Sequence, residues 1–518
     1  MSGKDYPDNG PGCRRCCVLT PICPLRYVRG HWRPGGLRVT KDEMTCTRVH
    51  AFACKIAAVL IATATAGLFS AFAAPAASAA TPTPQRLGYC GGDDWEPAMA
   101  ADSGHVYVLI THYSGDTSCD PASGQNNSRI MIQVSSDGGR TFAPPAVVAP
   151  APGGIAYPSQ ADPAIAVDKA TGAVYVSFLA FGLSGGHTDI YVAKSTDHGS
   201  SFAQAVQANS KGCRKCDHEK ILATNNVIYD AYTQGQSHFI AVSTDGGTTF
   251  TQNLVDSTFI VGFAEGGVLD AQGNAWFAWG DCSTSNCTGS PAGNYRVSET
   301  LAGGGATTFS PVLATTPQGP DCPFSKCGFS YFGPQDAIAI DSAGTMYLAW
   351  QTGQTAASKS PPIINLSKCS AGCLSASDWT QVGRVDDKTA ANCPGSACYA
   401  LFPNLVAAGP GQLYATWMDD RNDSLDGMLD HVDGYNLWLR SSTTGGTTWT
   451  GPGQQISGFD PSQSQETANG FLFPYGDYTG LIMNTTCTTP APAMAWGEGH
   501  NWQGGATAPG HIEFASFC

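Results

Sequence analysis

The sequence predicts an all-β protein in which residues 80–518 form a single β-propeller of four-stranded antiparallel blades. A short turn-forming segment recurs along the chain, and strand-like runs of alternating apolar residues precede it in most repeats. Aromatic and β-branched residues dominate these runs, as they do in β-strands generally. Because each repeat reads as strands joined by tight turns, it matches one propeller blade.

The recurring turn segment has eight residues and occurs four times, at 135–142, 195–202, 243–250 and 442–449, with a degenerate fifth copy that ends at 309. Three copies have an Asp at the third position, whose carboxylate can accept backbone N–H bonds inside a turn. Glycines after it can supply the positive φ angles of a tight hairpin. The fourth copy has Thr444 instead of Asp and should hold its turn less firmly. We call these the box segments and expect them to be structural.

The number of first strands predicts the number of blades. Seven units are counted, and we therefore favour seven blades, with six as the alternative. The last unit contains only three strand-like runs, so we expect residues just before Cys90 to supply its fourth strand and close the ring. The units begin near Glu96, Asp162, Glu219, Glu265, Asp336, Asn404 and Asp477.

The N-terminal region reads as a leader rather than as part of the fold. No charged residue occurs between residues 56 and 85, and the apolar run ends in Ala77-Ser78-Ala79. A basic start, an apolar stretch and a small-x-small site predict a signal peptide over residues 44–79. Residues 1–43 are expected to be a leader or a mis-called extension. A transmembrane anchor is the alternative, since the run is nearly long enough to span a bilayer.

Charge narrows the range of partners. Residues 80–518 keep 17 of the 27 basic and 37 of the 41 acidic residues, so the mature net charge is about −20. Such a surface repels nucleic acid and anionic membranes. We expect a secreted, extracellular monomer that binds a carbohydrate, does not bind nucleic acid and does not insert stably into a membrane. No cofactor is required by the sequence, no metal ligand is assigned, and Ca²⁺ is possible.

Cysteine spacing predicts disulfides. The mature region has an even number of cysteines, most in close pairs, which in an exported protein favours disulfide bonds. Zinc at Cys213 and Cys216 is the alternative, but a structural zinc site needs a second pair nearby. The predicted pairs are Cys90–Cys119, Cys213–Cys216, Cys282–Cys287, Cys322–Cys327, Cys369–Cys373, Cys393–Cys398 and Cys487–Cys518.

The box segments match the pattern Ser/Thr-x-Asp-x-Gly-x-Thr-Trp/Phe, and on them the chain resembles the sialidase-like, Asp-box (BNR repeat) β-propellers over nearly all of residues 90–518. The resemblance implies an exo-α-sialidase-type site with a Tyr nucleophile assisted by Glu, an Asp acid/base and three Arg that hold the sugar carboxylate. The chain departs from this pattern. The family's Phe/Tyr-Arg-Ile-Pro motif is absent, and the corresponding position reads Asp94-Trp95-Glu96-Pro97.

Topology predicts where a site would lie. The box turns share one face of the ring with the turns between first and second strands, whereas the starts of the first strands gather at the channel mouth on the other face. Carboxylates at this mouth suit a sugar or a cation. The candidate binding residues are Glu96, Asp162, Glu265, Asp336, Asp419 and Asp420. The candidate catalytic residues are Tyr475 as nucleophile, Asp477 as acid/base, Glu498 as assisting base and Arg421 as clamp.

Two functional hypotheses follow. One is a secreted glycoside hydrolase that acts on terminal sialic or other acidic sugars. The alternative is a non-catalytic extracellular propeller that binds a glycan, a cation or a protein. An arginine cluster at the mouth would favour the hydrolase, because guanidinium groups bind carboxylates in a bidentate manner. Carboxylates without such a cluster would favour binding.

Overall fold

The computed structural model describes the part of the chain that follows the predicted leader, within one compact unit, Ser78–Cys518. Among these residues no helix is both long and apolar enough to cross a membrane. The described residues are 81–114, 128–149, 159–181, 186–210, 212–213, 215–259, 261–282, 293–316, 335–352, 361–389, 391–393, 398–422, 435–458, 478–498 and 510–518.

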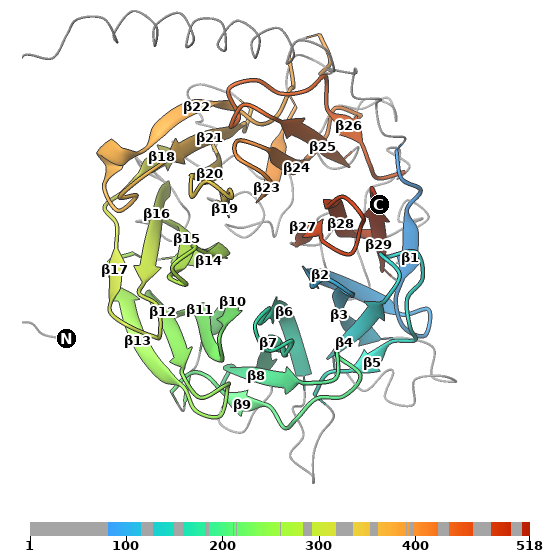
Figure 1. Cartoon of the computed structure of the whole chain (residues 1–518), viewed down its shortest axis with the longest axis vertical. Helices are drawn as coiled ribbons and strands as arrows, with labels where there is room; N and C mark the ends of the chain where they lie inside the picture. Colours follow the sequence, from blue (N-terminus) through green and yellow to red (C-terminus); the bar gives the residue numbers. More distant parts are fainter. Residues whose placement is uncertain are drawn as a thin grey trace, which may run out of the picture. The chain divides into compact units, whose positions relative to one another are not determined.

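Seven antiparallel sheets surround a central axis and form a seven-bladed β-propeller (Figure 1). Blades 1 to 3 comprise β2–β5 (Asp93–Ala101, Val106–Ser114, Arg129–Ser135, Ala146–Val147), β6–β9 (Ser159–Val167, Val174–Phe181, Asp189–Ser195, Val206–Gln207) and β10–β13 (Cys216–Thr224, Val227–Gln234, Ser237–Ser243, Thr251–Asp256). Blades 4 and 5 comprise β14–β18 (Val261–Leu269, Ala275–Cys282, Gly293–Thr300, Thr307–Phe309, Ala314–Thr316) and β19–β22 (Asp336–Ile340, Met346–Gln351, Ile364–Cys369, Thr380–Arg384), with a 3-10 turn η2 (Ala376–Asp378). Blade 6 is β23–β26 (Ala400–Ala407, Leu413–Asp419, Asn436–Ser442, Gln454–Gln455), and blade 7 is β27–β29 (Thr479–Asn484, Ala491–Glu498, His511–Ser516) with β1 (Gln85–Leu87).

The ring is closed by the two ends of the propeller, as the sequence predicted. Strand β1 pairs antiparallel with β29, so that Gln85 lies opposite Phe514 and Leu87 opposite Ile512. Blade 7 thus takes three strands from the C-terminal end and its outermost strand from the N-terminal end (Figure 1). The preference for seven blades over six is confirmed.

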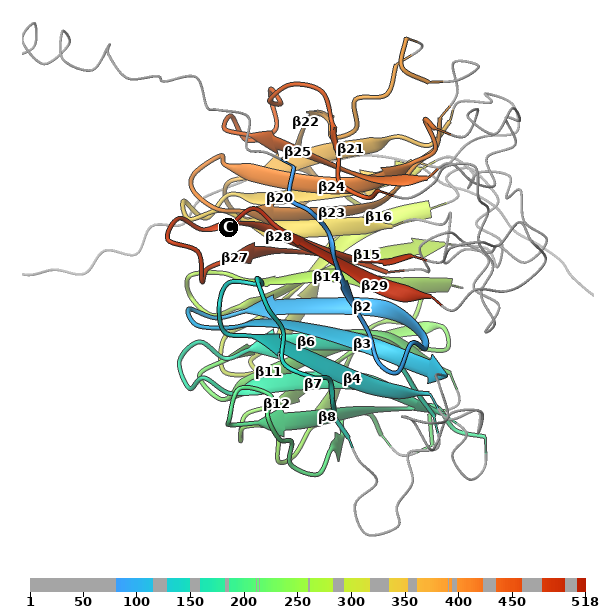
Figure 2. The ribbon, with the colours of Figure 1, turned by 90° about the vertical axis from the view of Figure 1, so that its right-hand side faces the viewer.

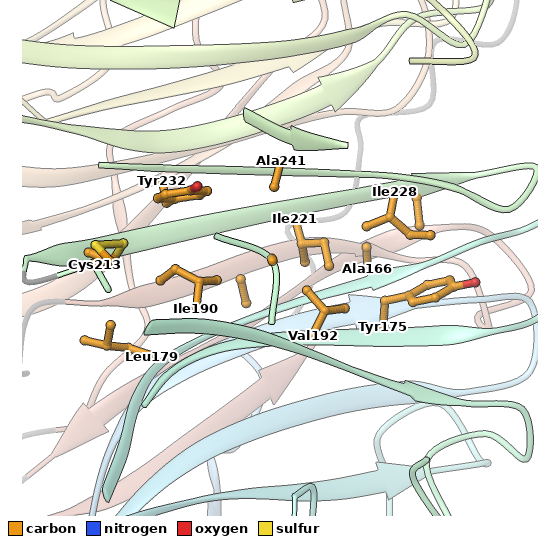
Figure 3. Close-up of a cluster of buried hydrophobic side chains, with 14 of the residues drawn as sticks. Ala166, Tyr175, Leu179, Ile190, Val192, Cys213, Ile221, Ile228, Tyr232 and Ala241 are labelled. Atoms are coloured by element: carbon orange, nitrogen blue, oxygen red, sulfur yellow. A yellow bond between two sulfur atoms is a disulfide. The ribbon is translucent and has the colours of Figure 1, made fainter. Parts of the chain in front are cut away.

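Apolar packing between neighbouring blades holds the ring together. Among the described residues, each of the seven interfaces between adjacent blades has its own cluster of buried side chains. Between blades 2 and 3, Ile190 and Val192 face Ile221 and Ile228 (Figure 3). In β11, Ile228 and Tyr232 pack into this interface and Tyr229 and Ala231 into the next one, which is the alternation expected of a strand.

The inner strands share an irregularity that decides where their carboxylates lie. Pairing with the second strand shifts register after Trp95 in β2, after Ala161 in β6 and after Asp217 in β10, and similar shifts occur in β14 and β23. The shifted residues Glu96 and Asp162 have positive φ angles of 55° and 54°. A bulge of this kind re-aims side chains, often beside functional sites. Here it turns acidic residues of neighbouring blades towards one another.

The box segments form the turns between the third and fourth strands of blades 1, 2, 3 and 6. In the turn of blade 3, Asp245 Oδ1 accepts hydrogen bonds from the N–H groups of Thr248 (3.0 Å) and Thr249 (2.9 Å), and Oδ2 accepts one from the Thr249 hydroxyl (2.7 Å). The second glycine fits against the preceding blade. A Cβ on Gly446, whose φ is 78°, would lie 2.1 Å from Leu366 Cδ2. The turns therefore brace one blade against the next.

Removing a box carboxylate should weaken the fold and leave ligand binding unchanged. Asp245→Ala loses the turn hydrogen bonds described above, and we expect the free energy of unfolding to fall by about 1–2 kcal/mol. Thr444→Ala is the matched control, because its hydroxyl accepts the Thr448 N–H (2.8 Å) without a carboxylate, and its effect should be smaller. Urea unfolding of both variants measures this. Equal losses, or a loss of ligand binding with normal stability, would contradict the structural role.

Four of the predicted disulfides are formed within the described residues: Cys213–Cys216, Cys369–Cys373, Cys393–Cys398 and Cys487–Cys518. The Cys213–Cys216 bond excludes the alternative that these two thiolates bind zinc in the oxidised protein. The pairs Cys90–Cys119, Cys282–Cys287 and Cys322–Cys327 each include at least one cysteine outside the described residues. Disulfides of this density fit an oxidising, extracellular compartment.

Candidate functional site

A cavity of about 490 Å³ runs along the propeller axis, and residues of all seven inner strands line it. Its wall extends from Lys169 and Thr485, next to the turns that leave the inner strands, to Lys220 and Asp336 near the strand starts. Seen from the side, the blades stack around this axis with their strand ends on two opposite faces (Figure 2). The cavity is therefore a channel, and we call the part lined by Lys220, Glu265 and Asp336 its charged end.

Asp162 is the centre of a chain of carboxyl groups at the charged end. Its side chain forms a hydrogen bond with the side chain of Asp217, and its backbone N–H donates to Glu96 Oε2 (2.9 Å). Tyr113 adds a hydrogen bond from its hydroxyl to Glu96 Oε1 (2.5 Å). We call Glu96, Asp162 and Asp217 the acid chain.

We expect one carboxyl group of the acid chain to stay protonated at neutral pH. Burial raises the pKa of Asp162 well above its ordinary value, and the charge of Asp217 and their hydrogen bond raise it further. Burial also raises the pKa of Asp217, while the hydrogen bond from Asp162 lowers it, so Asp162 holds the proton and Asp217 accepts the bond. Burial and the neighbouring Asp162 raise the pKa of Glu96 to about 7. Like charges this close cannot all ionise, which is the behaviour of a catalytic carboxyl pair.

The side chain of Lys220 provides positive charge at the charged end of the channel. It belongs to β10 and lines the channel, and its Nζ lies 4.8 Å from the centre of the Tyr478 ring. Its positive charge lowers the pKa of Asp162, Glu219 and Asp336, and likewise of Asp217, Asp230 and Glu265. Among the described residues of the seven inner strands, Lys220 is the only Lys or Arg. The charge of this one lysine thus lowers the pKa of carboxyl groups in four blades.

Further carboxyl groups face the channel from blades 4 and 5. Glu265 and Asp336 line it, and burial raises the pKa of Glu265 to about 7. Burial and the charge of Glu265 raise the pKa of Asp336 well above its ordinary value. Neither carboxylate oxygen of Asp336, which is 3% exposed, has a hydrogen-bond partner among the described residues, and the same holds for Glu219. Such buried oxygens are costly unless protonated or bound to a ligand.

Asp419 and Asp420 belong to a second set in blade 6, around Arg421. The Arg421 guanidinium donates to Asp419 Oδ2 (2.6 Å) and Asp387 Oδ1 (2.6 Å) and lies 3.8 Å over the Trp438 ring. Asp420 accepts the N–H of Tyr399 (2.5 Å). These ion pairs raise the pKa of Arg421 despite burial, which lowers it. The predicted sugar clamp is therefore already paired with two carboxylates of its own chain.

Glu498 lies in blade 7, in neither set. It is 4% exposed and accepts a hydrogen bond from Trp496 Nε1 (2.7 Å). Burial raises its pKa to about 7, with a contribution from Glu513. The other two predicted catalytic residues, Tyr475 and Asp477, lie outside the described residues.

The described arginines lie away from the inner strands. Arg296 in β16 pairs with Asp281 (3.4 Å) and Asp256 (3.5 Å), and Arg440 in β25 donates to backbone carbonyls. The remaining ones are Arg86, Arg129, Arg140, Arg384 and Arg421, in or next to β1, β4, the first box segment, β22 and β24. The described residues thus bring carboxylates and one lysine together, without an arginine cluster on the channel.

The sequence prediction missed Asp217, Lys220 and Tyr113. Lys220 could have been recognised from the sequence, because it is a lone basic residue in the middle of an inner-strand run, Cys216–Thr224. Asp217 and Tyr113 had none, because their roles depend on the bulges and on contacts between strands of different blades. Of the predicted residues, Asp336 begins its inner strand, whereas Glu96, Asp162 and Glu265 lie at the fourth or fifth residue of theirs. Glu96 and Asp336 are buried rather than displayed at an open mouth.

No protein-family model matches the chain, and no curated protein does. Among solved structures, a Hadza microbial sialidase is 12% identical, with 83% of this chain and 68% of that chain covered and a TM-score of 0.45. An ulvan lyase, from a family of polysaccharide lyases, is 10% identical, with 84% and 96% covered and a TM-score of 0.49. An α-L-arabinanase of Penicillium chrysogenum is 11% identical, with 69% and 93% covered and a TM-score of 0.41.

Proposed function

We propose that this protein is a secreted, glycan-acting propeller that cleaves a glycosidic bond at the charged end of its channel. The observation that supports this most is the hydrogen bond between the buried side chains of Asp162 and Asp217, in the neighbourhood of Lys220, where burial raises the pKa of both carboxyl groups. Glycosidic bonds need an acid that is still protonated near neutral pH to protonate the leaving oxygen. A buried carboxyl pair next to a channel can supply such an acid, and Pro163, the neighbour of Asp162, lines the channel. Perturbed carboxyl groups at a cavity often mark functional sites.

In this proposal the residues have separate roles. Asp162 is the general acid, and Asp217 and Glu96 keep it protonated and oriented. Glu265, which lines the channel and has a pKa of about 7, is the base that activates water. Lys220 donates to sugar hydroxyls or ring oxygens and limits the repulsion among the carboxylates. Two carboxyl groups in different environments are what acid–base hydrolysis of glycosides requires.

The charge of the site favours a neutral sugar over an acidic one. A sugar carboxylate needs a cationic clamp, most effectively bidentate arginine. Among the described residues Arg421 is paired with Asp387 and Asp419, and no arginine lies on an inner strand. A sialic or other acidic sugar would place its charge among carboxyl groups, and Lys220 is the one basic residue that the described inner strands offer to balance it. We therefore propose neutral glycans as the substrate class.

Calcium is a second candidate ligand for the same channel. The observation that favours it is the pair of unpartnered oxygens on Asp336, with Glu219 in the same state, since Ca²⁺ binds carboxylate oxygens. A bound cation would remove the cost of burying these groups. The proposed glycan cleavage does not depend on calcium, because the hydrogen bonds of the acid chain form without a metal.

Assays on a panel of glycans distinguish neutral from acidic substrates, test the role of Ca²⁺, and separate an enzyme from a binding propeller. The secreted protein is incubated with neutral aryl glycosides and oligosaccharides and with sialosides, each with added Ca²⁺ or with a chelator. We expect turnover of a neutral substrate, highest near neutral or mildly acidic pH, where Asp162 is protonated. Turnover of sialosides alone would contradict the proposed sugar class. No turnover of any substrate, with measurable glycan binding, would contradict the enzyme and favour a binding propeller.

A further inference from the structure

A compact group of two histidines and one aspartate lies on the opposite face from the acid chain, between blades 1 and 2. Asp102 and His105 belong to the turn between β2 and β3, and His198 belongs to the box segment of blade 2. His105 Nδ1 lies 3.3 Å from Asp102 Oδ1, and His198 Nδ1 lies 3.7 Å from Asp102 Oδ2. One ligand atom from each of the three residues lies within 4.8 Å of the others. The imidazole rings stack with centroids 4.1 Å apart.

His198 stands where the turn itself requires glycine. It has a φ of 56°, and the same position is Gly138, Gly246 and Gly445 in the other box segments, with φ of 84°, 71° and 63°. L-residues rarely adopt this left-handed conformation, and a residue held there has a conformational cost. Glycine would form the turn at lower cost, so the turn does not explain the imidazole. We look for the explanation in the residues of blade 1 that face His198 across the interface between the two blades.

Asp102 is oriented towards that imidazole. Its Oδ1 accepts the N–H groups of Gly104 and His105 (2.7 Å each), and its Oδ2 accepts the Tyr107 hydroxyl (2.7 Å). These hydrogen bonds outweigh burial, which raises the pKa, and hold the pKa of Asp102 below its ordinary value. The carboxylate is therefore ionised and fixed in direction, as supporting hydrogen bonds do for ligands in metal sites.

The equivalent turns of other blades show what is different here. In blade 2, Asp168 Oδ2 accepts the N–H of Asn226 from blade 3 (2.8 Å). In blade 5, Asp341 Oδ2 accepts the N–H of Gly411 from blade 6 (2.8 Å). In blade 1, the group of the next blade that faces Asp102 Oδ2 is the His198 ring. In blades 2 and 5 the donor is a backbone group in the first turn of the next blade, whereas in blade 1 the facing group is a side chain of the next blade's box segment.

We propose that Asp102, His105 and His198 bind a zinc ion that links blade 1 to blade 2. Zinc takes imidazole nitrogen and carboxylate oxygen at about 2.0–2.2 Å in a tetrahedron, so its ligand atoms lie about 3.3 Å apart. The two imidazole nitrogens lie 3.3 Å from Oδ1 and 3.7 Å from Oδ2 of the same carboxylate, and one ligand atom of each residue lies within 4.8 Å of the others, so small side-chain movements would bring all three around one ion. His198 is 50% exposed, which gives the ion a way in and leaves room for water as a fourth ligand. The site lies on the box face and is separate from the proposed glycan site.

The competing explanation is that His105 and His198 contact Asp102 directly, without a metal. Tyr107 belongs to this explanation as well, because its hydroxyl lies 3.3 Å from His198 Nδ1. The two explanations differ in one measurable respect. Only the first predicts stoichiometric zinc binding at pH 7.5 that depends on both histidines.

Zinc titration by calorimetry, with melting temperatures recorded with and without Zn²⁺, tests the proposal. The wild-type protein should bind one more equivalent than H198G, and H105A should lose the same equivalent or bind it more than about 100-fold more weakly. Without zinc, H198G should melt at the same temperature as wild type or higher, because glycine relieves the strained φ. Zinc should raise the melting temperature of wild type more than that of either variant.

A control in the same turn separates ligand loss from damage to the fold. Thr196→Ala changes an exposed residue of the same box segment and should keep the zinc equivalent. Glu498, His511 and Glu513 form another cluster that could take up metal, so the decisive quantity is the difference in stoichiometry between wild type and H198G. Equal stoichiometry and affinity in wild type, H198G and H105A would overturn the site. So would a wild-type protein that binds no zinc at pH 7.5.

Discussion

Replacing Asp162 by Asn is expected to lower the turnover of a neutral glycan by about 10²–10⁴-fold, the usual contribution of a general acid. Asn has nearly the same shape as Asp and can donate to Asp217, but it has no proton to give to a leaving oxygen. It also tolerates the φ of 54° at this position, since Asn is enriched in left-handed conformations. The fold should therefore survive, and kcat/KM measured beside a melting curve reports the chemistry.

A matched control uses a carboxylate that lies on the other face. Asp197→Asn changes the box segment of blade 2, whose carboxylate accepts the Ser201 N–H (2.9 Å), and should leave kcat/KM unchanged. The pH profile adds a second readout. Loss of the acid should remove the fall in activity at high pH that reports deprotonation of Asp162. Unchanged turnover in Asp162→Asn would exclude the acid chain from catalysis.

The second large effect is on stability as a function of pH. Asp230 in β11 is fully buried, its Oδ2 accepts the Ser177 hydroxyl (2.7 Å), and burial raises its pKa to about 7. A carboxyl with a raised folded-state pKa contributes stability that is present below its unfolded pKa, near 4, and is lost as pH rises through 7. With about 1.4 kcal/mol for each pKa unit, Asp230 alone should cost the wild type about 3 kcal/mol between pH 5 and pH 8.

Asp230→Asn isolates this contribution. Its free energy of unfolding in urea should change with pH by about 3 kcal/mol less than that of wild type over the same range, and it should be the more stable protein at pH 8. His218 and His238 have pKa values lowered by burial and act in the opposite direction below pH 6.5, but equally in both proteins. Parallel pH curves for the two proteins would show that Asp230 titrates normally.

The architecture was predictable from the sequence because its causes are local. Each box segment specifies its own turn through hydrogen bonds within five residues, such as those of Asp245. The alternation of apolar residues specifies strands, and the incomplete last unit predicts closure by residues 85–87. Seven repeats of a unit that cannot bury its own faces then require a ring.

The site was only partly predictable, because ring closure and bulges create it. Positions at the starts of inner strands identified Glu96, Asp162, Glu265 and Asp336. The sequence did not show that the bulges place Asp162 against Asp217, or that Lys220 acts on carboxyls of other blades. It also did not show that Arg421 pairs with Asp387, which lies 34 residues away along the chain. Such contacts depend on distances in the folded protein, which the spacing of residues along the sequence does not predict.

The most direct test of the account is a crystal structure of Asp162→Asn with an uncleaved neutral substrate from the panel. The account predicts that the sugar lies at the charged end of the channel, with the glycosidic oxygen within hydrogen-bond distance of residue 162 and a hydroxyl in contact with Lys220. A sugar bound instead at Arg421 and Glu498, with the channel free of ligand, would contradict it.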